Sequence, residues 1–363
     1  MSDETKPDLP VTTEEAPNTT LDAVTDLALD STIPAPIRRN VFKAFDRLCS
    51  ALIDVPVEAL ERRSSEKRAE SEARIKIIRE NADQIAQQMK VDPEYARIAV
   101  SKYGQKILRE QVNLDKISAI AAEELKKAIA AEKTNQSTGE PNKEGPAEAT
   151  NQGTDNNEET TINDDWLNNF ETEARQVSTE DMQRHFGRVL AGEIRKPGSY
   201  STRTVKILSE LDHDVAVLFK KLCSTSIAFE NRTDGYVIDV RVLTLGRNLR
   251  QVGLSEGCLN YYQLDNLIEY GLVDFMENVY LYPYNLCIEN LSNPMPQPFW
   301  HQERDWIFSP LDPIQEFKLQ GFSCSRAGRE LYRIVDIELM PEYTEDLKKF
   351  LAEQNLAMIE VNT

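Results

Sequence analysis

The residues that come closest to a phosphate-binding motif lie in the stretch FGRVLAGEIRKPGSYSTRTVKIL, residues 186–208. A P-loop needs Gly-x4-Gly-Lys-Ser/Thr after a strand, so that successive backbone amides and the lysine surround the phosphates. Here Gly192 and Gly198 are one residue too far apart, no Gly-Lys-Ser follows, and the preceding residues have helical spacing. We predict instead a type II turn between two helices, with Pro197 at its second position and Gly198 at its third. This stretch is predicted to be a structural corner.

The side chains that could hold a metal or act as nucleophiles show no convincing spacing. The three histidines are far apart and form neither HExxH nor Hx3–5H: His185, His213 and His301. Asp312, Glu316 and Lys318 resemble the Asp…Glu-x-Lys triad of nucleases, but a charged chain readily produces such a set by coincidence. We therefore predict no catalytic residue, no metal site and no cofactor.

A basic face is predicted on a helix near the C-terminus. Arg326, Arg329 and Arg333 fall at i, i+3 and i+7, and so they share one side of that helix. Such a face can contact the phosphates of a nucleic acid, or it can pair with acidic residues of a neighbouring segment. We favour pairing with acidic residues and keep nucleic-acid contact as the alternative.

A tyrosine-rich, acidic surface is predicted upstream of that helix. Residues 254–300 contain no Lys or Arg but six acidic residues, so this surface repels DNA. Tyrosines are enriched at protein interfaces. The tyrosines predicted to form a protein interface are Tyr261, Tyr262, Tyr280 and Tyr282.

Composition limits the class of protein and its partners. The formal net charge is −19, which disfavours a polyanion as a partner of the whole surface. The five cysteines show no CxxC, and this favours a reducing compartment. The first residues are acidic and rich in Pro and Thr, unlike a signal peptide, and no run of 18 apolar residues occurs. We predict a cytoplasmic protein.

The elements that carry these residues divide into five predicted parts. Residues 1–30 are predicted to be a disordered tail and residues 31–133 a helical arm. Residues 134–164, rich in Asn, Thr, Gly and Glu, are predicted to be a flexible linker. Four helical stripes predict a bundle over residues 165–225, and alternating strands with a capped helix predict a winged-helix-like α+β domain over 226–363. The predicted fold is mainly α with a smaller α+β part.

Two predicted helices of the arm could make contacts of different kinds. Residues 37–53 form a basic amphipathic stripe, for which we favour packing on a partner helix over contact with an anionic membrane. Residues 57–89 are charged on nearly every face. A helix of that kind could bury its few apolar residues against a copy of itself: Leu60, Ile78, Ile85 and Met89.

At the level of whole segments, the chain resembles a bacterial family known as domain of unknown function 2806. The likeness rests on IPAPIRRNVFKAFDRLCSALIDVPVEALE, on ILREQVNLDKISAIAAEEL and on FGRVLAGEIRKPGSYSTRTVKILSELDHDVAVLF. The resemblance implies bacterial origin and segments that belong to one fold. It implies no catalytic residue.

The function expected from these features is that of a non-catalytic interaction or regulatory protein. It would act through helical, coiled-coil-like self-assembly or through binding another protein. The alternative is a nucleic-acid-associated protein, a phage-defence component or a nuclease, supported by the Arg326/Arg329/Arg333 face and the predicted winged helix.

Overall fold

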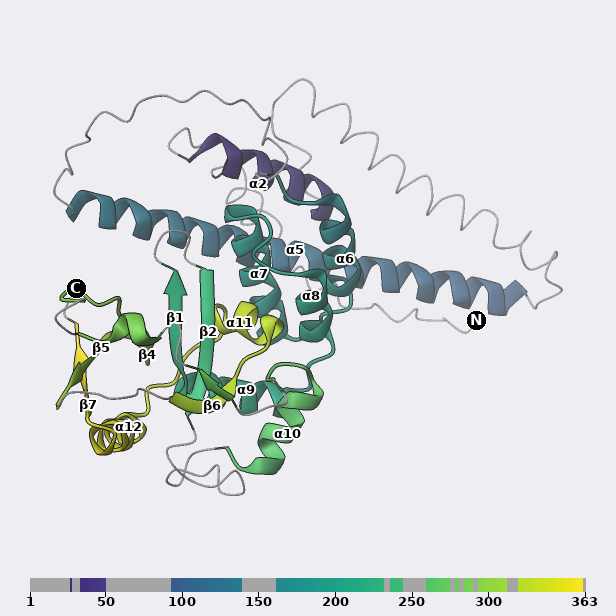
Figure 1. Cartoon of the computed structure of the whole chain (residues 1–363). Helices are drawn as coiled ribbons and strands as arrows, with labels where there is room; N and C mark the ends of the chain where they lie inside the picture. The colour runs from purple at the N-terminus through teal and green to yellow at the C-terminus, as the bar shows by residue number, and fades with distance from the viewer. Residues whose placement is uncertain are drawn as a thin grey trace, which may run out of the picture. The chain divides into compact units, whose positions relative to one another are not determined.

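The computed structural model describes residues 27, 33–49, 93–138, 161–231, 236–243, 259–274, 278–280, 284–289, 293–311 and 319–361 (Figure 1). The chain divides into two compact units. Unit 1 comprises Met1–Ile162 and Ala174–Lys196, and unit 2 comprises Asn163–Glu173 and Pro197–Thr363. The described residues form a mainly α fold with an α+β part, as the sequence predicts.

Several predicted features lie outside the described residues. These are nearly all of the tail 1–30, the charged helix at 57–89 and residues 139–160 of the predicted linker. At the start of that linker, the helix α5 (Pro93–Thr138) continues past residue 133.

The helix α2 (Ala35–Leu48) of unit 1 has a proline in its first turn, where the backbone N–H that proline lacks would have no partner within the helix. Its stripe of Val41, Ala44, Phe45 and Leu48 is at most 1% exposed. The buried Asn40 ties the helix to other parts of unit 1, because its amide donates to the Ile194 carbonyl at 3.1 Å and accepts from the Ile162 N–H at 3.1 Å. The apolar face that contact of 37–53 with a membrane would need is therefore buried.

The helix α7 (Glu180–Arg195) packs closely against α5 within unit 1. At Gly187, a Cβ atom would overlap the side chain of Ile120, so this crossing depends on the missing side chain. The N-cap of α7 is Thr179. The close crossing fixes α7 on the C-terminal half of α5.

Unit 2 begins with α6 (Asp164–Ala174), α8 (Thr202–Ser209) and α9 (His213–Thr225). Glu173 joins α6 to α8, since it accepts hydrogen bonds from Lys206 at 3.0 Å and from the Ser209 hydroxyl at 2.8 Å. The four helices that the sequence places in one bundle over 165–225 are thus divided, with α7 in unit 1 and the other three in unit 2. Helical periodicity reveals each helix but not its packing partners, which accounts for this difference.

A seven-stranded antiparallel sheet forms the centre of unit 2, in the order β3-β6-β2-β1-β4-β5-β7 (Figure 1). Its strands are β1 (Ile227–Asn231), β2 (Tyr236–Leu243), β3 (Asn278–Tyr280), β4 (Phe299–His301), β5 (Arg304–Pro310), β6 (Leu319–Ser323) and β7 (Leu356–Glu360). The accompanying helices are α10 (Tyr261–Glu269), the 3-10 helix η3 (Tyr284–Cys287), α11 (Arg326–Tyr332) and α12 (Pro341–Glu353). The sheet leaves β3 and β7 as its edge strands.

Local patterns predict some of these strands and miss the pairing of others. The alternating stretch at 235–243 is β2, and the terminal helix and strand are α12 and β7. The stretch at 278–288 is predicted to be one or two strands, and it contains β3 followed by the 3-10 helix η3. β3 pairs with β6, which follows 39 residues after Tyr280. The winged-helix-like arrangement stays a prediction.

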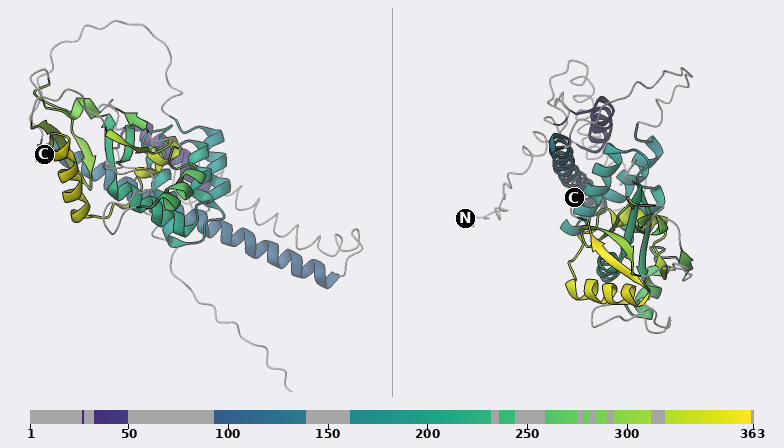
Figure 2. Two further views of the ribbon diagram at one scale, coloured as in Figure 1. Left: turned by 60° about the horizontal axis from the view of Figure 1, so that its bottom comes forward. Right: turned by 60° about the vertical axis from the view of Figure 1, so that its left-hand side comes forward.

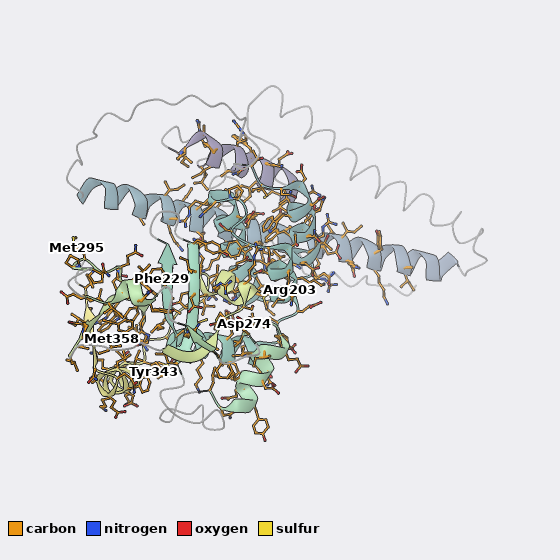
Figure 3. All side chains as sticks on the ribbon, viewed as in Figure 1. Arg203, Phe229, Asp274, Met295, Tyr343 and Met358 are labelled. Atoms are coloured by element: carbon orange, nitrogen blue, oxygen red, sulfur yellow. The ribbon has the colours of Figure 1, made fainter. Side chains whose placement is uncertain are left out.

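One face of the sheet is covered by α12, and the core of unit 2 lies between them. Figure 3 labels Phe229, Tyr343 and Met358, which come from β1, α12 and β7 and belong to this core. Phe299 of β4 and Phe308 of β5 stack with their ring centroids 4.3 Å apart. The C-terminal helix and strand are therefore integral parts of the fold of unit 2.

Candidate functional site

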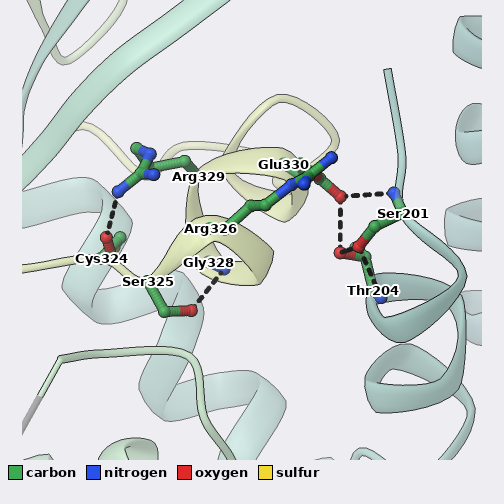
Figure 4. A network of polar contacts seen from close by, with 8 residues as sticks. All are labelled: Ser201, Thr204, Cys324, Ser325, Arg326, Gly328, Arg329 and Glu330. Atoms are coloured by element: carbon green, nitrogen blue, oxygen red, sulfur yellow. Dashed lines mark hydrogen bonds and ion pairs between the residues drawn. The ribbon is translucent and has the colours of Figure 1, made fainter. Parts of the chain in front are cut away.

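The predicted basic face lies on α11 (Figure 4). Hydrogen bonds at the N-terminal end of this helix fix its position. The Ser325 hydroxyl accepts from the Gly328 N–H at 3.2 Å and donates to the Gly271 carbonyl at 2.5 Å, at the C-terminal end of α10. Gly271 has φ of +71°, the left-handed backbone that a glycine commonly adopts directly after a helix. A Cβ atom at Gly328 would collide with the Leu272 carbonyl. These contacts make α11 a short helix whose position is tightly fixed.

Arg326 and Glu330 form the central pair of this site. The Glu330 side chain is almost fully buried, and one oxygen, Oε2, accepts from the Ser201 N–H at 2.7 Å and from the Thr204 hydroxyl at 2.5 Å. The other oxygen, Oε1, accepts from Arg326 Nε at 2.7 Å, although the Arg326 side chain is 65% exposed. Figure 4 shows one Glu330 carboxylate oxygen joined by dashed lines to Ser201 and Thr204. The Glu330 carboxylate therefore anchors α11 to the start of α8.

The other two arginines of the predicted face are also engaged with unit 2. Arg329 donates from Nη1 to the Cys324 carbonyl at 2.9 Å, and its Nε is buried with no hydrogen-bond partner among the described residues. Arg333 follows α11 as its C-cap and is half-buried. Desolvation raises the pKa of Glu230 on β1, and the charge of Arg333 opposes that shift. The three arginines thus differ in environment, and Arg326 is the most exposed.

Pro197 and Gly198 lie in a turn, as the sequence predicts. Gly198 has φ of +84°, as the third position of a type II turn requires, and no atom lies within 4 Å of where its Cβ would be. Ser201 caps α8, because its hydroxyl accepts from the Thr204 N–H at 3.2 Å. Pro197 and Gly198 form a turn, and the next helix is capped by the protein's own hydroxyl.

The predicted tyrosine surface is described at one position. The Tyr262 side chain on α10 is 80% exposed. Tyr261 and Tyr280 belong to α10 and β3, whose side chains at these positions are outside the described set, and Tyr282 lies outside the described residues. Tyr284, which stands in the same segment, is fully buried and donates to the Ile227 carbonyl at 3.2 Å. A protein interface at Tyr262 stays a prediction.

A buried ion pair in the sheet is a feature that the sequence analysis does not single out. Arg241 on β2 is 1% exposed, and its Nε lies 3.2 Å from Oδ2 of Asp239 on the same strand. The two residues stand at i and i+2, so they share a face of the strand. Two opposite charges at that spacing within the apolar stretch 236–243 are the signal that could have revealed the pair.

His301 and Gln302 form a second buried polar cluster, at the hairpin between β4 and β5. Gln302 and Glu303 have φ of 49° and 63°, the signature of a two-residue type I′ turn. His301 Nδ1 lies 2.9 Å from the Ser226 carbonyl and Nε2 lies 3.1 Å from the Thr344 hydroxyl. A neutral ring with its proton on Nδ1 satisfies both contacts. Burial lowers the pKa of His301 to about 4, so the histidine is a structural link to α12 at neutral pH.

The described residues contain no group of three or more His, Cys, Asp or Glu placed to hold a metal ion. Burial raises the pKa of the Cys49 thiol to about 12 and that of the Cys324 thiol well above its ordinary value, which disfavours the reactive thiolates. The nuclease-like set at 312–318 lies outside the described residues.

A further motif of catalytic type occurs at residues 253–257, where GLSEG matches GxSxG. In hydrolases this serine stands on a sharp turn between a strand and a helix. The stretch lies outside the described residues, ten residues beyond the end of β2. The prediction of no catalytic residue rested in part on the absence of a GxSxG motif, and that absence is wrong.

The N-terminal half of α5 presents apolar side chains to solvent. The C-terminal half of the helix is packed, with Ile117, Ala121 and Leu125 fully buried. Upstream, the exposed large apolar side chains are Ile98 at 50%, Tyr103 at 55%, Leu108 at 63% and Val112 at 49%. One helix therefore carries both a buried core face and an exposed apolar region.

None of the described helices combines the length and the apolar character that crossing a membrane requires.

A comparison with known protein families finds a match, which covers most of the elements described above. The model of a family described as "Protein of unknown function (DUF2806)" matches residues 146–348. The chain belongs to this family. No curated protein and no solved structure matches the chain.

The family region covers α6 to α11 and most of α12, and so it includes the corner at Gly198 and the Glu330 contacts. The helices α2 and α5 precede it. The exposed apolar residues of α5 therefore lie in the part of this chain that the family model does not match.

Proposed function

We propose that this protein is a non-catalytic interaction or regulatory protein, and that it acts by self-assembly through the N-terminal half of α5. The observation that carries the proposal is the set of apolar side chains exposed at Ile98, Leu108 and Val112. Isolated exposed apolar residues are common, but a row of them along one helix is typical of a helix–helix interface.

The spacing of these residues supports a helical partner. Ile98 and Val112 are separated by two heptads, and Leu108 precedes Val112 by one helical turn. The three side chains therefore share a face, whereas Tyr103 points to another side of the helix. Lys106 and Glu110 form an i,i+4 pair with a 3.6 Å separation on the exposed surface, which keeps the surroundings of the stripe polar. A second copy of α5 would bury the stripe.

Burial of the stripe can supply the free energy of association. Each fully buried Leu or Val side chain contributes about 1.5–3 kcal/mol relative to exposure. The three side chains that each copy contributes are 49–63% exposed, so each gains roughly half of that value on association. The summed gain competes with the entropy lost on association. An acidic protein partner is the alternative within the same class, because Lys102, Lys106 and Arg109 are exposed on this half of the helix.

Sedimentation velocity of the full chain tests the proposal. Wild type should sediment as an oligomer of the 41.3 kDa chain, and Leu108→Glu/Val112→Glu should shift it to the monomer because the stripe would then bury two carboxylates. Ala131→Glu, at an exposed position on the packed half of α5, is the control and should leave the oligomer intact. A wild type that is monomeric at all concentrations tested would refute self-assembly through α5.

The nucleic-acid reading, including a phage-defence component or a nuclease, is the second candidate. It is favoured by the exposure of Arg326 and by the predicted winged helix, to which α10 and the strand β3 that follows it would correspond. Against it stand the net charge of −19 and the pairing of Arg326 with Glu330. In a gel-retardation assay we expect no tight binding of duplex DNA at physiological salt. Retardation that is lost in Arg326→Ala would instead favour this candidate.

We place this activity in the cytoplasm. The described cysteines are free thiols: Cys49, Cys223, Cys287 and Cys324. Free cysteines are typical of a reducing compartment, which supports the assignment.

A further inference from the structure

The edge strand β7 carries backbone groups that no described residue satisfies. β7 is the last strand of the sheet and pairs with β5 on one side. The right-hand view in Figure 2 brings β7 and α12 to the front of unit 2. β7 pairs with β5 at every one of its positions without a bulge, from Leu356↔Pro310 to Glu360↔Trp306. An unblocked, regular edge of this kind is a template for another strand.

The register shows which groups point outward. Val361 donates to the Asp305 carbonyl at 2.9 Å, and Leu311 donates to the Asn355 carbonyl at 2.9 Å. In an antiparallel ladder, hydrogen-bonded positions alternate, so residues 355, 357, 359 and 361 direct their backbone groups to β5. Leu356, Met358 and Glu360 therefore direct their N–H and C=O groups to the open edge.

We infer that this edge pairs with β7 of a second copy of the chain, antiparallel and centred on Met358. In that register Met358 faces Met358 of the second copy, and Leu356 faces Glu360 of the second copy. Since these are the outward-directed residues, every open N–H and C=O group at the edge gains a partner. The two sheets would become one continuous sheet about a two-fold axis, the symmetry that most homodimers adopt.

Side-chain size and charge are compatible with this pairing. On the face away from α12, Ala357 of one copy stands opposite Ile359 of the other, so a small side chain meets a large one. Ile359 is 43% exposed and would be covered. The two Glu360 carboxylates do not face each other, and each is bound by Arg304 of its own chain through Nη1 at 3.0 and 3.1 Å. No like charges are therefore brought together at the edge.

A peptide partner is less well supported than a second copy. Peptide recognition by strand addition needs pockets beside the edge that select alternate side chains. The described neighbours of β7 offer instead the self-matching register above. One pair of short strands buries less area than the roughly 1,200 Å² of a stable interface, so the contact should be weak and depend on concentration.

The variant Glu360→Pro tests the contribution of the open edge of β7 separately from the pairing of β7 with β5. Proline at 360 removes the outward N–H but none of the bonds from β7 to β5, because the bond at that end comes from Val361. Glu360→Ala is the matched control, since it loses the same ion pair with Arg304 and keeps the N–H. Both are made in the full chain carrying Leu108→Glu/Val112→Glu, so that association through α5 does not contribute.

In sedimentation equilibrium, Glu360→Pro should weaken the association of this background at least tenfold relative to Glu360→Ala. Amide hydrogen exchange at Met358 and Glu360 should also slow as the concentration of the background protein rises. Equal association of the two variants, or exchange at these amides that does not change with concentration, would overturn the β7 pairing. Neither result would affect the α5 interface, which is judged on the wild-type chain and its own variants.

Discussion

The buried carboxylate of Glu330 should contribute far more to the stability of unit 2 than the exposed arginine bound to it. Ser201 and Thr204 donate to one oxygen from partly or fully buried positions, whereas Arg326 reaches the other oxygen from the surface. We expect Glu330→Gln to lower the free energy of unfolding by about 2–3 kcal/mol, because two charged hydrogen bonds worth about 1.5–3 kcal/mol each become neutral ones worth about 0.5–1.5 kcal/mol.

Arg326→Ala should cost less than about 1 kcal/mol, since the guanidinium is largely solvated and a surface pair is screened. Thr204→Val should cost about 1–3 kcal/mol, because it leaves Glu330 without one of its buried donors. The double variant Thr204→Val/Glu330→Gln should lose less than the sum of the two changes, as expected for groups in one network.

Urea unfolding followed by tryptophan fluorescence measures these changes in the free energy of unfolding of unit 2. The chain has three tryptophans, and Trp166, Trp300 and Trp306 all belong to unit 2. Their signal therefore reports on that unit without a contribution from unit 1. If Arg326→Ala destabilised unit 2 as much as Glu330→Gln, or if Glu330→Gln cost under 1 kcal/mol, the assignment of Glu330 as the anchor of α11 would be refuted.

Two further changes test backbone and protonation arguments. Gly198→Val should destabilise the fold by about 1–3 kcal/mol, because a β-branched residue is strained at a φ of +84°. Gly104→Ala, in open space on α5, should stabilise the fold by about 0.5–1 kcal/mol. Thermal unfolding measures both changes, and melting temperatures that shift in the same direction would contradict this reasoning. The pKa of His301 is about 4 in the folded chain, against an ordinary value of 6.5 for histidine, so the unfolded chain binds more protons between these two pH values. Stability should therefore be fully present above pH 6.5 and fall as the pH drops toward 4, by about 3 kcal/mol in total. His301→Gln should flatten this dependence, and an unchanged slope in His301→Gln would contradict the assignment.

Features that depend on a few neighbouring residues were predictable from the chain alone. The turn at Pro197-Gly198 follows from residue types that tolerate its dihedral angles, and Gly271 follows from the same rule at the end of a helix. The helices α2, α8 and α9 follow from apolar spacing, and β2 follows from alternation. The family resemblance was readable from the contiguous segment 186–219, which lies within the matched residues 146–348, whereas the other two segments quoted for it precede the matched region.

Features that depend on distant contacts were not predictable. Glu330 meets Ser201 across 129 residues, and nothing in its helical spacing distinguishes it from a solvated charge. The arginine triplet shares a helical face, yet Arg329 is half-buried and Arg326 is paired, because the surroundings of α11 come from α8, α10 and β2. Nothing in the sequence separates Tyr284 from the other tyrosines of its segment, yet its side chain is fully buried.

The sheet shows the same division between local and distant information. Alternation identifies a strand but not its neighbour, since the same pleated pattern satisfies many partners. The pairing of β3 with β6, and the placement of β7 at an edge where Leu356, Met358 and Glu360 face outward, arise only when the whole of unit 2 is assembled. Short segments of the sequence thus determine the helices and turns of this protein, because these depend on neighbouring residues. Its buried charges and its open strand edge depend on contacts between distant residues, and only the packed chain determines them.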